Sequence, residues 1–226
     1  GADIIDVGGE STRPGAERIT EEEELKRVIP VITEIVKDGA VVSIDTTRSE
    51  VAKQAIAAGA TYVNDVSGGL ADEKMAALIA ANPKVQYIVM HWRGESKDMQ
   101  SKAVYQDVVK EVKDELDERV TELLKAGVLA EQIILDPGIG FAKEPEHNWE
   151  ILKNIERFQL LGYPLLIGAS RKRFLGELVN AKETDDREAA SIALTAELAR
   201  LNVWGVRTHS VKPHRDAIAV IDRLRK

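Results

Sequence analysis

The chain has 226 residues, of which 44% are hydrophobic and 31% are charged, with a formal net charge of −7 and no cysteine. This composition is typical of a globular protein with a sizeable core, and the negative charge argues against nucleic-acid or anionic-membrane partners. The lack of cysteine excludes disulfides, thiolate metal sites and cysteine nucleophiles, and it fits a reducing cytoplasm. No apolar run approaches the ~20 residues of a membrane-spanning helix. We therefore expect a soluble, cytoplasmic protein.

Seven short runs rich in valine and isoleucine each end in a polar or glycine cluster, which is typical of buried parallel strands. They are DIIDVGG (3–9), VVSIDTT (41–47), TYVNDVSGG (61–69), VQYIVMHWRG (85–94), QIILDPGIG (132–140), PLLIGASRK (164–172) and WGVRTHSV (204–211).

Amphipathic stretches with helical spacing lie between these runs. They cover residues 20–39, 48–60, 71–81, 105–127, 148–162 and 186–202. The first is expected to begin at Thr20 as N-cap, with Glu23 as its capping-box partner, and to end near Gly39.

Strands that alternate with helices predict a parallel sheet covered by helices. An open doubly wound sheet would gather its ligand groups at one switch point, whereas here every strand ends in polar residues, as in a (β/α)8 barrel. A barrel of ~250 residues has ~31 residues per unit, so this length favours a barrel whose first β/α unit is absent from the chain. We expect one domain, 1–226, with seven strand–helix units and residues 3–9 as the second strand of a TIM barrel.

Polar residues at the strand ends are the candidate site. They are Asp45, Asn64, Asp65, Asp136, Lys172, Arg207 and His209. A carboxylate that ends a hydrophobic strand is costly unless it is paired or used. Asp45 could instead cap the next helix, and Asp65 could brace its own loop. Capping is a weaker explanation for Asp136, because the following proline and glycines cannot begin a helix at once.

The charges are segregated along the chain. The carboxylates and the amide lie on the middle strands, whereas the basic residues lie on loops near the closure of the barrel, where phosphate sites are common. The basic residues are Arg13, Arg171, Lys172, Arg207 and His209. A carboxylate accepts paired hydrogen bonds from an amino-pyrimidinone edge. The sequence therefore predicts an amino-substituted heterocycle with an anionic tail as the ligand.

Seven motifs in order resemble dihydropteroate synthase, an enzyme of folate biosynthesis, and two of them look most like its actinobacterial branch. The motifs are IDVGGESTRPGA, SIDTTRSEVA, YVNDVSGG, MHWRG, ILDPGIGFAK, LLIGASRKRFLG and VRTHSV. The resemblance implies a (β/α)8 barrel that condenses 6-hydroxymethyl-7,8-dihydropterin pyrophosphate with p-aminobenzoate to give 7,8-dihydropteroate and pyrophosphate. It also implies Mg2+ as cofactor, sulfonamides as inhibitors and a homodimer.

The resemblance also implies roles for matching residues. The pterin site comprises Asp45, Asn64, Met90, Asp136 and Lys172. The pyrophosphate site comprises Arg13, Arg207 and His209. The p-aminobenzoate site comprises Thr12, Arg13, Pro14, Phe141 and Ser170. The catalytic residues are Asp45, Lys172, Arg207 and His209. No metal ligand is expected in this chain, because the family's asparagine ligand belongs to the loop of the absent first unit.

Two other functions remain open. One is a pterin-binding paralogue that does not condense two substrates, and the other is a corrinoid-linked pterin methyltransferase. The remaining histidines carry weaker expectations. At the end of its strand, a role for Met90 as a pocket wall is favoured over a catalytic role for His91. His147 is expected to lie at the start of a helix, and His214 on the surface.

Overall fold

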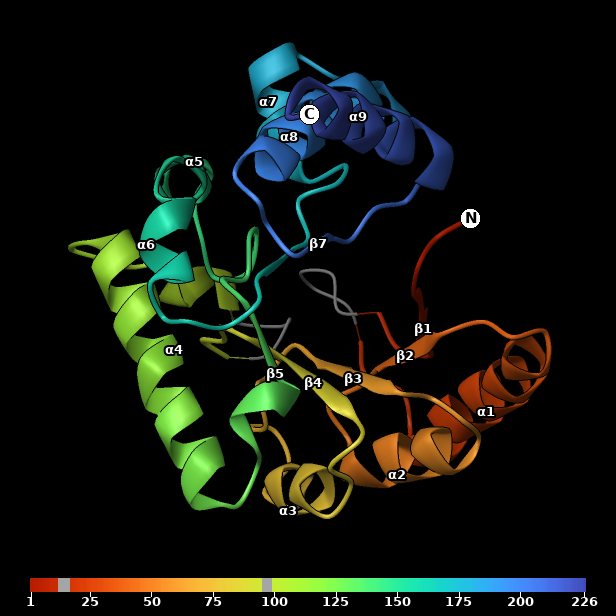
Figure 1. Ribbon diagram of the computed structural model, residues 1–226. Helices are drawn as coiled ribbons and strands as arrows, with labels where there is room; N and C mark the ends of the chain where they lie inside the picture. The colour runs from red at the N-terminus through yellow and green to blue at the C-terminus, as the bar shows by residue number, and fades with distance from the viewer. Residues whose placement is uncertain (12–16, 95–98) are drawn as a thin grey trace.

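The computed structural model describes residues 1–11, 17–94 and 99–226. Strands and helices alternate as expected, and Figure 1 shows the helices arranged around the outside of the strands. The strands are β1 (Ile5–Gly8), β2 (Val42–Asp45), β3 (Tyr62–Asp65), β4 (Gln86–Met90), β5 (Ile133–Asp136), β6 (Leu166–Ile167) and β7 (Gly205–Val206). The helices are α1 (Glu21–Lys37), α2 (Ser49–Ala57), α3 (Met75–Ala80), α4 (Val108–Lys125), α5 (Pro145–Lys153), α6 (Ile155–Gln159), α7 (Arg173–Val179), α8 (Glu188–Arg200) and α9 (Val211–Leu224).

The strands lie side by side in chain order and are parallel. Strands β1 to β5 form one sheet, an isolated bridge joins Leu135 of β5 to Leu165, and β6 pairs with β7. Each parallel pair is joined by a helical crossover, which is the arrangement of a TIM barrel. Between β7 and β1 the described residues form no strand pairing, but the Arg207–Asp6 ion pair connects these two ends.

Side-chain alternation along the strands builds two layers in the interior. Tyr62, Ile88, Ile134 and Leu166 form an apolar cluster. Two residues further along each strand, on the same face, the chain places polar or small residues. These are Asn64, Met90, Asp136 and Gly168. The apolar layer thus closes the interior below the candidate site, and the opposite strand faces pack against the helices in the main core.

Helix α1 begins as predicted, because the Thr20 hydroxyl accepts the backbone N–H of Glu23, and Gly39 follows its end with φ 81°. The single helix predicted over 148–162 is wrong, since the structure has α5 and α6 with a break at Asn154. The Asn154 side chain donates to the carbonyl of Glu150, a local bond that competes with regular helix. Helices α7 and α9 were not predicted. In the described part of the chain, no helix is long and apolar enough to cross a membrane.

Candidate active site

Four neighbouring strands place a polar or sulfur-bearing side chain near their carboxyl ends on one interior surface. Asp45 pairs in register with Asn64, and Met90 pairs with Asp136. Asn64, Met90 and Asp136 are buried, and the side chain of Asp45 is 10% exposed. The structure therefore brings together the four strand-end residues that the sequence assigned to one ligand.

Asp136 has one oxygen engaged by its own loop and one that lies beside Gly168. Oδ1 accepts the backbone N–H of Gly138 at 2.7 Å. Oδ2 faces Gly168, where an added Cβ would still lie 3.9 Å away. Burial raises the pKa of Asp136, and the nearby Lys172 opposes that rise. The arrangement can present a carboxylate oxygen to a donor in the interior.

Lys172 interacts with this carboxylate and with an aromatic ring. Its Nζ donates to the carbonyl of Ile139 and lies 4.5 Å from the ring centroid of Phe141. Burial lowers its pKa to about 8, and Asp136 counteracts that effect. Lys172 is also the N-cap residue of α7, and the extended backbone there turns its side chain out of the helix. One lysine therefore contacts the loop after β5 and faces the strand-end carboxylate.

A second cluster surrounds Arg207, which follows β7. Its Nε donates to Oδ2 of Asp6 at 2.6 Å, and its NH2 lies 3.5 Å from Oδ2 of Asp45. The same Asp6 oxygen accepts from Asn64 Nδ2 at 3.1 Å. Burial and the adjacent Asp6 raise the pKa of Asp45 to about 8, although Arg207 opposes the rise. Oδ1 of Asp6 and Oδ1 of Asp45 are both buried without a hydrogen-bond partner among the described residues.

Asp6 was missed by the sequence analysis. Its signal was present, because the residue lies inside a hydrophobic strand on the same face as Gly8, which is the register partner of Asp45. A charged residue at such an interior position is costly unless it is paired. The sequence analysis assigned ligand binding to the loop after this strand instead.

Ser170 and His209 meet at the ends of β6 and β7. The Ser170 hydroxyl accepts the His209 backbone N–H at 3.4 Å and lies 3.1 Å from Nδ1 of the ring. Arg171 has φ 57° and binds Glu188 at 2.6 Å and the Ser210 hydroxyl at 2.8 Å. Arg171 therefore anchors this loop to α8, and its charge is engaged there.

Thr12, Arg13 and Pro14 lie outside the described residues, but the chain on both sides of them meets at Glu10. Glu10 accepts from Arg18 Nε at 3.1 Å, from the Ile19 backbone at 3.0 Å and from Arg48 NH2 at 3.0 Å. Arg48 also binds the buried Glu24. This ion-pair network fixes where the segment leaves the barrel and where it rejoins α1.

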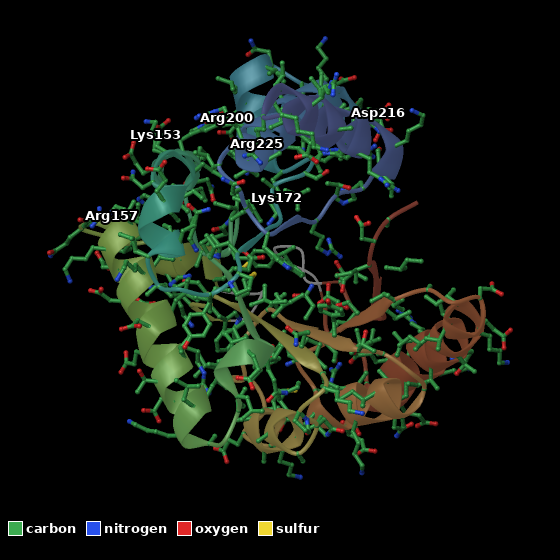
Figure 2. The ribbon with its side chains drawn as sticks, in the orientation of Figure 1. Lys153, Arg157, Lys172, Arg200, Asp216 and Arg225 are labelled. Carbon is green, nitrogen blue, oxygen red and sulfur yellow. The ribbon has the colours of Figure 1, made fainter. Side chains whose placement is uncertain are left out.

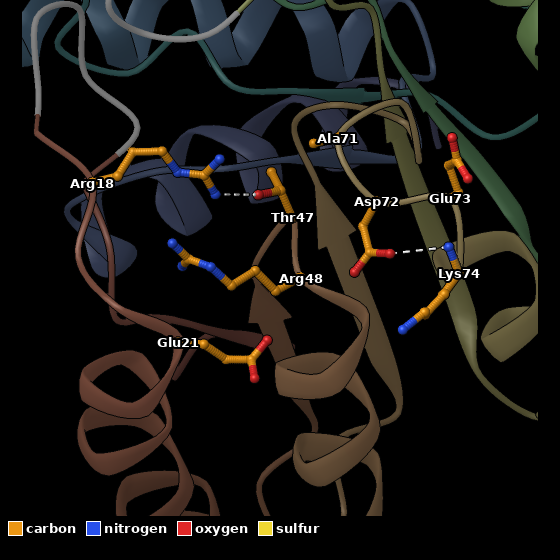
Figure 3. A pocket seen from close by; sticks show the side chains of 8 residues that line it. All are labelled: Arg18, Glu21, Thr47, Arg48, Ala71, Asp72, Glu73 and Lys74. Carbon is orange, nitrogen blue, oxygen red and sulfur yellow. Dashed lines mark hydrogen bonds between the residues drawn. The ribbon is translucent and has the colours of Figure 1, made fainter.

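A hollow of about 690 Å³ lies beside this network, and Figure 3 shows its lining. The lining residues are Arg18, Glu21, Thr47, Arg48, Ala71, Asp72, Glu73 and Lys74. Arg18 donates to the Thr47 hydroxyl at 3.0 Å, and Asp72 accepts the backbone N–H groups of Ser49 and Lys74. No strand-end residue of the interior cluster lines this hollow, so we assign it no ligand.

The structure resolves the two alternatives left open for aspartates. Asp72, not Asp45, accepts the N–H of Ser49 at the start of α2, so Asp45 is free of a capping role. Asp65 accepts from the Ser67 backbone and hydroxyl, the Gly69 backbone and the Tyr87 hydroxyl. It therefore braces its own loop.

The histidines differ from one another. His147 lies in the first turn of α5, as predicted. The prediction that His214 lies on the surface is wrong, because its ring is buried, with Nδ1 2.7 Å from the Thr195 hydroxyl. His214 is the buried residue of α9, a helix that the sequence analysis did not predict. His91 is buried beside Lys143 and Glu115.

Among the described residues, no group of three or more histidine, cysteine, aspartate or glutamate side chains could hold a metal ion. Asp6 and Asp45 approach each other, but Arg207 lies between their charges. The described side chains therefore do not form a Mg2+ site by themselves.

A family model described as pterin binding enzyme matches residues 1–209. The chain belongs to this family. It is 46% identical to the dihydropteroate synthase of Mycobacterium leprae over 227 residues, which covers 98% of this chain and 80% of that protein.

Solved structures of the family superpose closely on the chain. A dihydropteroate synthase from Xanthomonas albilineans with 4-aminobenzoic acid has a TM-score of 0.94 and 38% identity, covering 100% of this chain and 80% of the other. A dihydropteroate synthase from Yersinia pestis in a sulfonamide drug complex has a TM-score of 0.95 and 31% identity, covering 100% and 81%. The structural likeness extends over the whole chain, and the TIM-barrel prediction is confirmed.

Proposed function

We propose that the chain is a dihydropteroate synthase, which condenses 6-hydroxymethyl-7,8-dihydropterin pyrophosphate with p-aminobenzoate to give 7,8-dihydropteroate and pyrophosphate. The observation that carries the proposal is the arrangement around Asp136. Its buried carboxylate has Oδ2 beside Gly168, and Lys172 interacts with this carboxylate and lies 4.5 Å from the Phe141 ring centroid. One carboxylate for an amino-heterocycle thus adjoins one aromatic wall for a second ring.

In this proposal the pterin lies on the strand ends. Asp136 accepts the amino and ring N–H groups, as carboxylates do for guanidine-like edges. Asn64 lies at the neighbouring edge, Met90 forms a wall, and Lys172 donates toward the ring carbonyl. The burial of Asn64, Met90 and Asp136 supports this placement, because a dry pocket strengthens each hydrogen bond.

The anionic tail lies toward the basic residues at the other side of the interior. Arg207 and His209 bind the pyrophosphate, and Arg13 joins them from the opening loop. Arg207 is held by Asp6 through Nε, and this leaves the guanidinium oriented toward the site. Magnesium remains part of the proposal as the cofactor implied by the family.

The arylamine lies between the opening loop and the loop after β6. Thr12, Arg13 and Pro14 line it on one side, and Phe141 and Ser170 line it on the other. The hydroxyl of Ser170 is buried beside His209, so a substrate carboxylate there would meet polar donors. Sulfonamides would compete at this position.

The chemistry follows from these charges. The methylene C–O bond breaks, the pyrophosphate leaves with the electron pair, and positive charge spreads into the pterin ring. Arg207 and His209 stabilise the leaving anion, while Asp45 stabilises the developing cation. The arylamine nitrogen then forms a bond to the methylene carbon and releases a proton to solvent. The proposed catalytic residues are therefore Asp45, Lys172, Arg207 and His209, and no nucleophilic side chain is needed.

We further propose a single domain, 1–226, that works in the cytoplasm as a homodimer without a nucleic-acid partner. The cysteine-free composition supports the cytoplasmic location, and the net charge of −7 argues against a nucleic-acid partner. Exposed apolar side chains on α9, Val220 and Leu224, support self-association through the last helices.

The test is incubation of the protein with the pterin pyrophosphate, p-aminobenzoate and Mg2+. Release of pyrophosphate that depends on the arylamine supports the proposal. Pterin binding without pyrophosphate release from a folded protein would contradict it and indicate the non-condensing paralogue. Methyl transfer from a pterin donor would indicate the corrinoid-linked enzyme.

A further inference from the structure

Lys143 is a buried lysine to which the proposed function gives no role, and burial lowers its pKa to about 7. It lies in the loop between β5 and α5 and is 3% exposed. It makes two polar contacts among the described residues. Its Nζ lies 3.0 Å from Nδ1 of His91 and donates to the carbonyl of Phe141 at 3.0 Å. Burying an amino group this deeply is costly unless its hydrogen bonds are made.

The contact with His91 fixes the tautomer of that ring. Nδ1 faces the amino group of Lys143 and accepts from it, so Nε2 carries the hydrogen and donates to Glu115 at 2.9 Å. Burial and Lys143 lower the pKa of His91 to about 4, and the neutral ring is the form that can accept at Nδ1. Lys143, His91 and Glu115 thus form a directed chain of hydrogen bonds.

The far end of this chain is anchored on α4. Glu115 binds Arg93, which lies 4.0 Å from the ring centroid of Tyr105. The Tyr105 hydroxyl donates to the carbonyl of Ala142 at 2.9 Å. The loop after β5 is therefore tied to the same helix by two routes, one through Lys143 and one through Tyr105.

The loop held in this way carries groups for both substrates. Asp136 lies at its start and Phe141 near its end. The amino group of Lys143 lies behind the turn, 3.4 Å from where a Cβ would stand on Gly138. Burial raises the pKa of Asp136, and the charge of protonated Lys143 lowers it. A change at Lys143 would therefore act on two ligand subsites at once.

We propose that Lys143 is a positioning residue that fixes the loop 137–142 and thereby sets the Asp136 carboxylate and the Phe141 ring in one geometry. The inference rests on the proposed function, since it assumes that these two groups face the two halves of one product. Lys143 itself touches neither half.

The test measures the affinity of the chain for 7,8-dihydropteroate, which spans both subsites, and for 4-aminobenzoate alone. Lys143→Met removes the amino group and keeps most of the side-chain volume. We expect dihydropteroate to bind about tenfold more weakly or worse, since misplaced groups lose binding steeply. Lys153→Met on α5 is the matched control, because Lys153 is exposed (Figure 2) and binds only Glu150 among the described residues. The affinity of this variant for both ligands should stay unchanged.

A purely structural role would leave ligand affinity unchanged. Titrations are therefore made at a temperature where circular dichroism shows every variant folded. Lys143→Gln is the second variant, since its amide can still donate to the Phe141 carbonyl but carries no charge. We expect it to recover part of the affinity lost in Lys143→Met.

A double variant tests whether Lys143 acts through His91. If the two belong to one chain, Lys143→Met combined with His91→Leu loses less affinity than the sum of the two single losses. Wild-type affinity in both Lys143 variants, or failure of both to fold at low temperature, would overturn the inference. A wild-type chain that does not bind dihydropteroate would instead contradict the proposed function.

Discussion

Arg207 Nε and Asp6 Oδ2 lie 2.6 Å apart, although the two residues are separated by 201 positions in the chain. The pair joins the first described strand to the loop after the last one. Because the same Asp6 oxygen also accepts from Asn64, one carboxylate orients a cation and an amide of the candidate site. Burial raises the pKa of Asp45, and the charge of Asp6 raises it further.

Replacing Asp6 should therefore change the pH dependence of turnover. Burial and then Asp6 raise the pKa of Asp45 to about 8, and turnover requires ionised Asp45 in the proposed mechanism. In the wild type, kcat/KM should rise with pH toward about 8. In Asp6→Asn the rise should occur at lower pH, because a negative charge beside Asp45 is gone. The measurement is kcat/KM for the pterin pyrophosphate across this range.

Asp114→Asn on the exposed face of α4 is the control for Asp6→Asn, since it makes the same change in net charge far from the interior. Its profile should coincide with that of the wild type. A profile of Asp6→Asn that does not move, or moves to higher pH, would show that Asp6 does not govern Asp45.

Lys172→Ala should abolish turnover while the fold remains. The substitution removes the cation that interacts with Asp136 and with the Phe141 ring, and we expect a loss of about 100-fold or more in kcat/KM. Arg173→Ala is the neighbouring control, because the Arg173 side chain is 90% exposed. Unfolding of Lys172→Ala in far-ultraviolet circular dichroism would show that Lys172 serves the structure instead.

Asp45→Asn should lose activity and gain stability at alkaline pH. A carboxyl whose pKa is higher in the folded than in the unfolded protein stabilises the fold most below its ordinary pKa of 3.8, and this contribution is lost as pH rises through about 8. At pH ~9 the variant should exceed the wild type in the free energy of unfolding, on the order of a few kcal/mol. Near pH ~4 the two should agree. Urea unfolding at both pH values measures this, and equal stabilities at pH ~9 would refute the raised pKa.

Gly138→Ala should be more harmful than Gly39→Ala. Both glycines have positive φ, 71° and 81°, so both substitutions strain the backbone, by roughly 1 kcal/mol. A Cβ on Gly138 would also lie 2.7 Å from the His91 carbonyl oxygen, whereas one on Gly39 meets nothing within 4 Å. Thermal unfolding of the two variants separates steric conflict from strain. Equal losses of thermal stability would mean that the loop after β5 shifts to accommodate the added methyl group without further cost.

The strand ends were predictable because each apolar run stops at a chemically distinct residue. Asp45, Asn64 and Asp136 needed only strand periodicity and the rule that parallel strands end at one edge. Asp6 carries a local signal, a charge inside a hydrophobic strand, but its partner Arg207 is 201 positions away and could not be predicted from the sequence. The role of the buried Lys143 could not be predicted either, because its neighbour His91 follows β4 and is 52 positions away.

The most direct test of the central claim is the stoichiometry of products from one reaction mixture. The protein is incubated with 6-hydroxymethyl-7,8-dihydropterin pyrophosphate, p-aminobenzoate and Mg2+, and dihydropteroate and pyrophosphate are quantified together. We predict equal amounts of the two, and neither when the arylamine is omitted. Pyrophosphate released at the same rate without p-aminobenzoate, or no dihydropteroate from the folded protein, would contradict the proposed condensation.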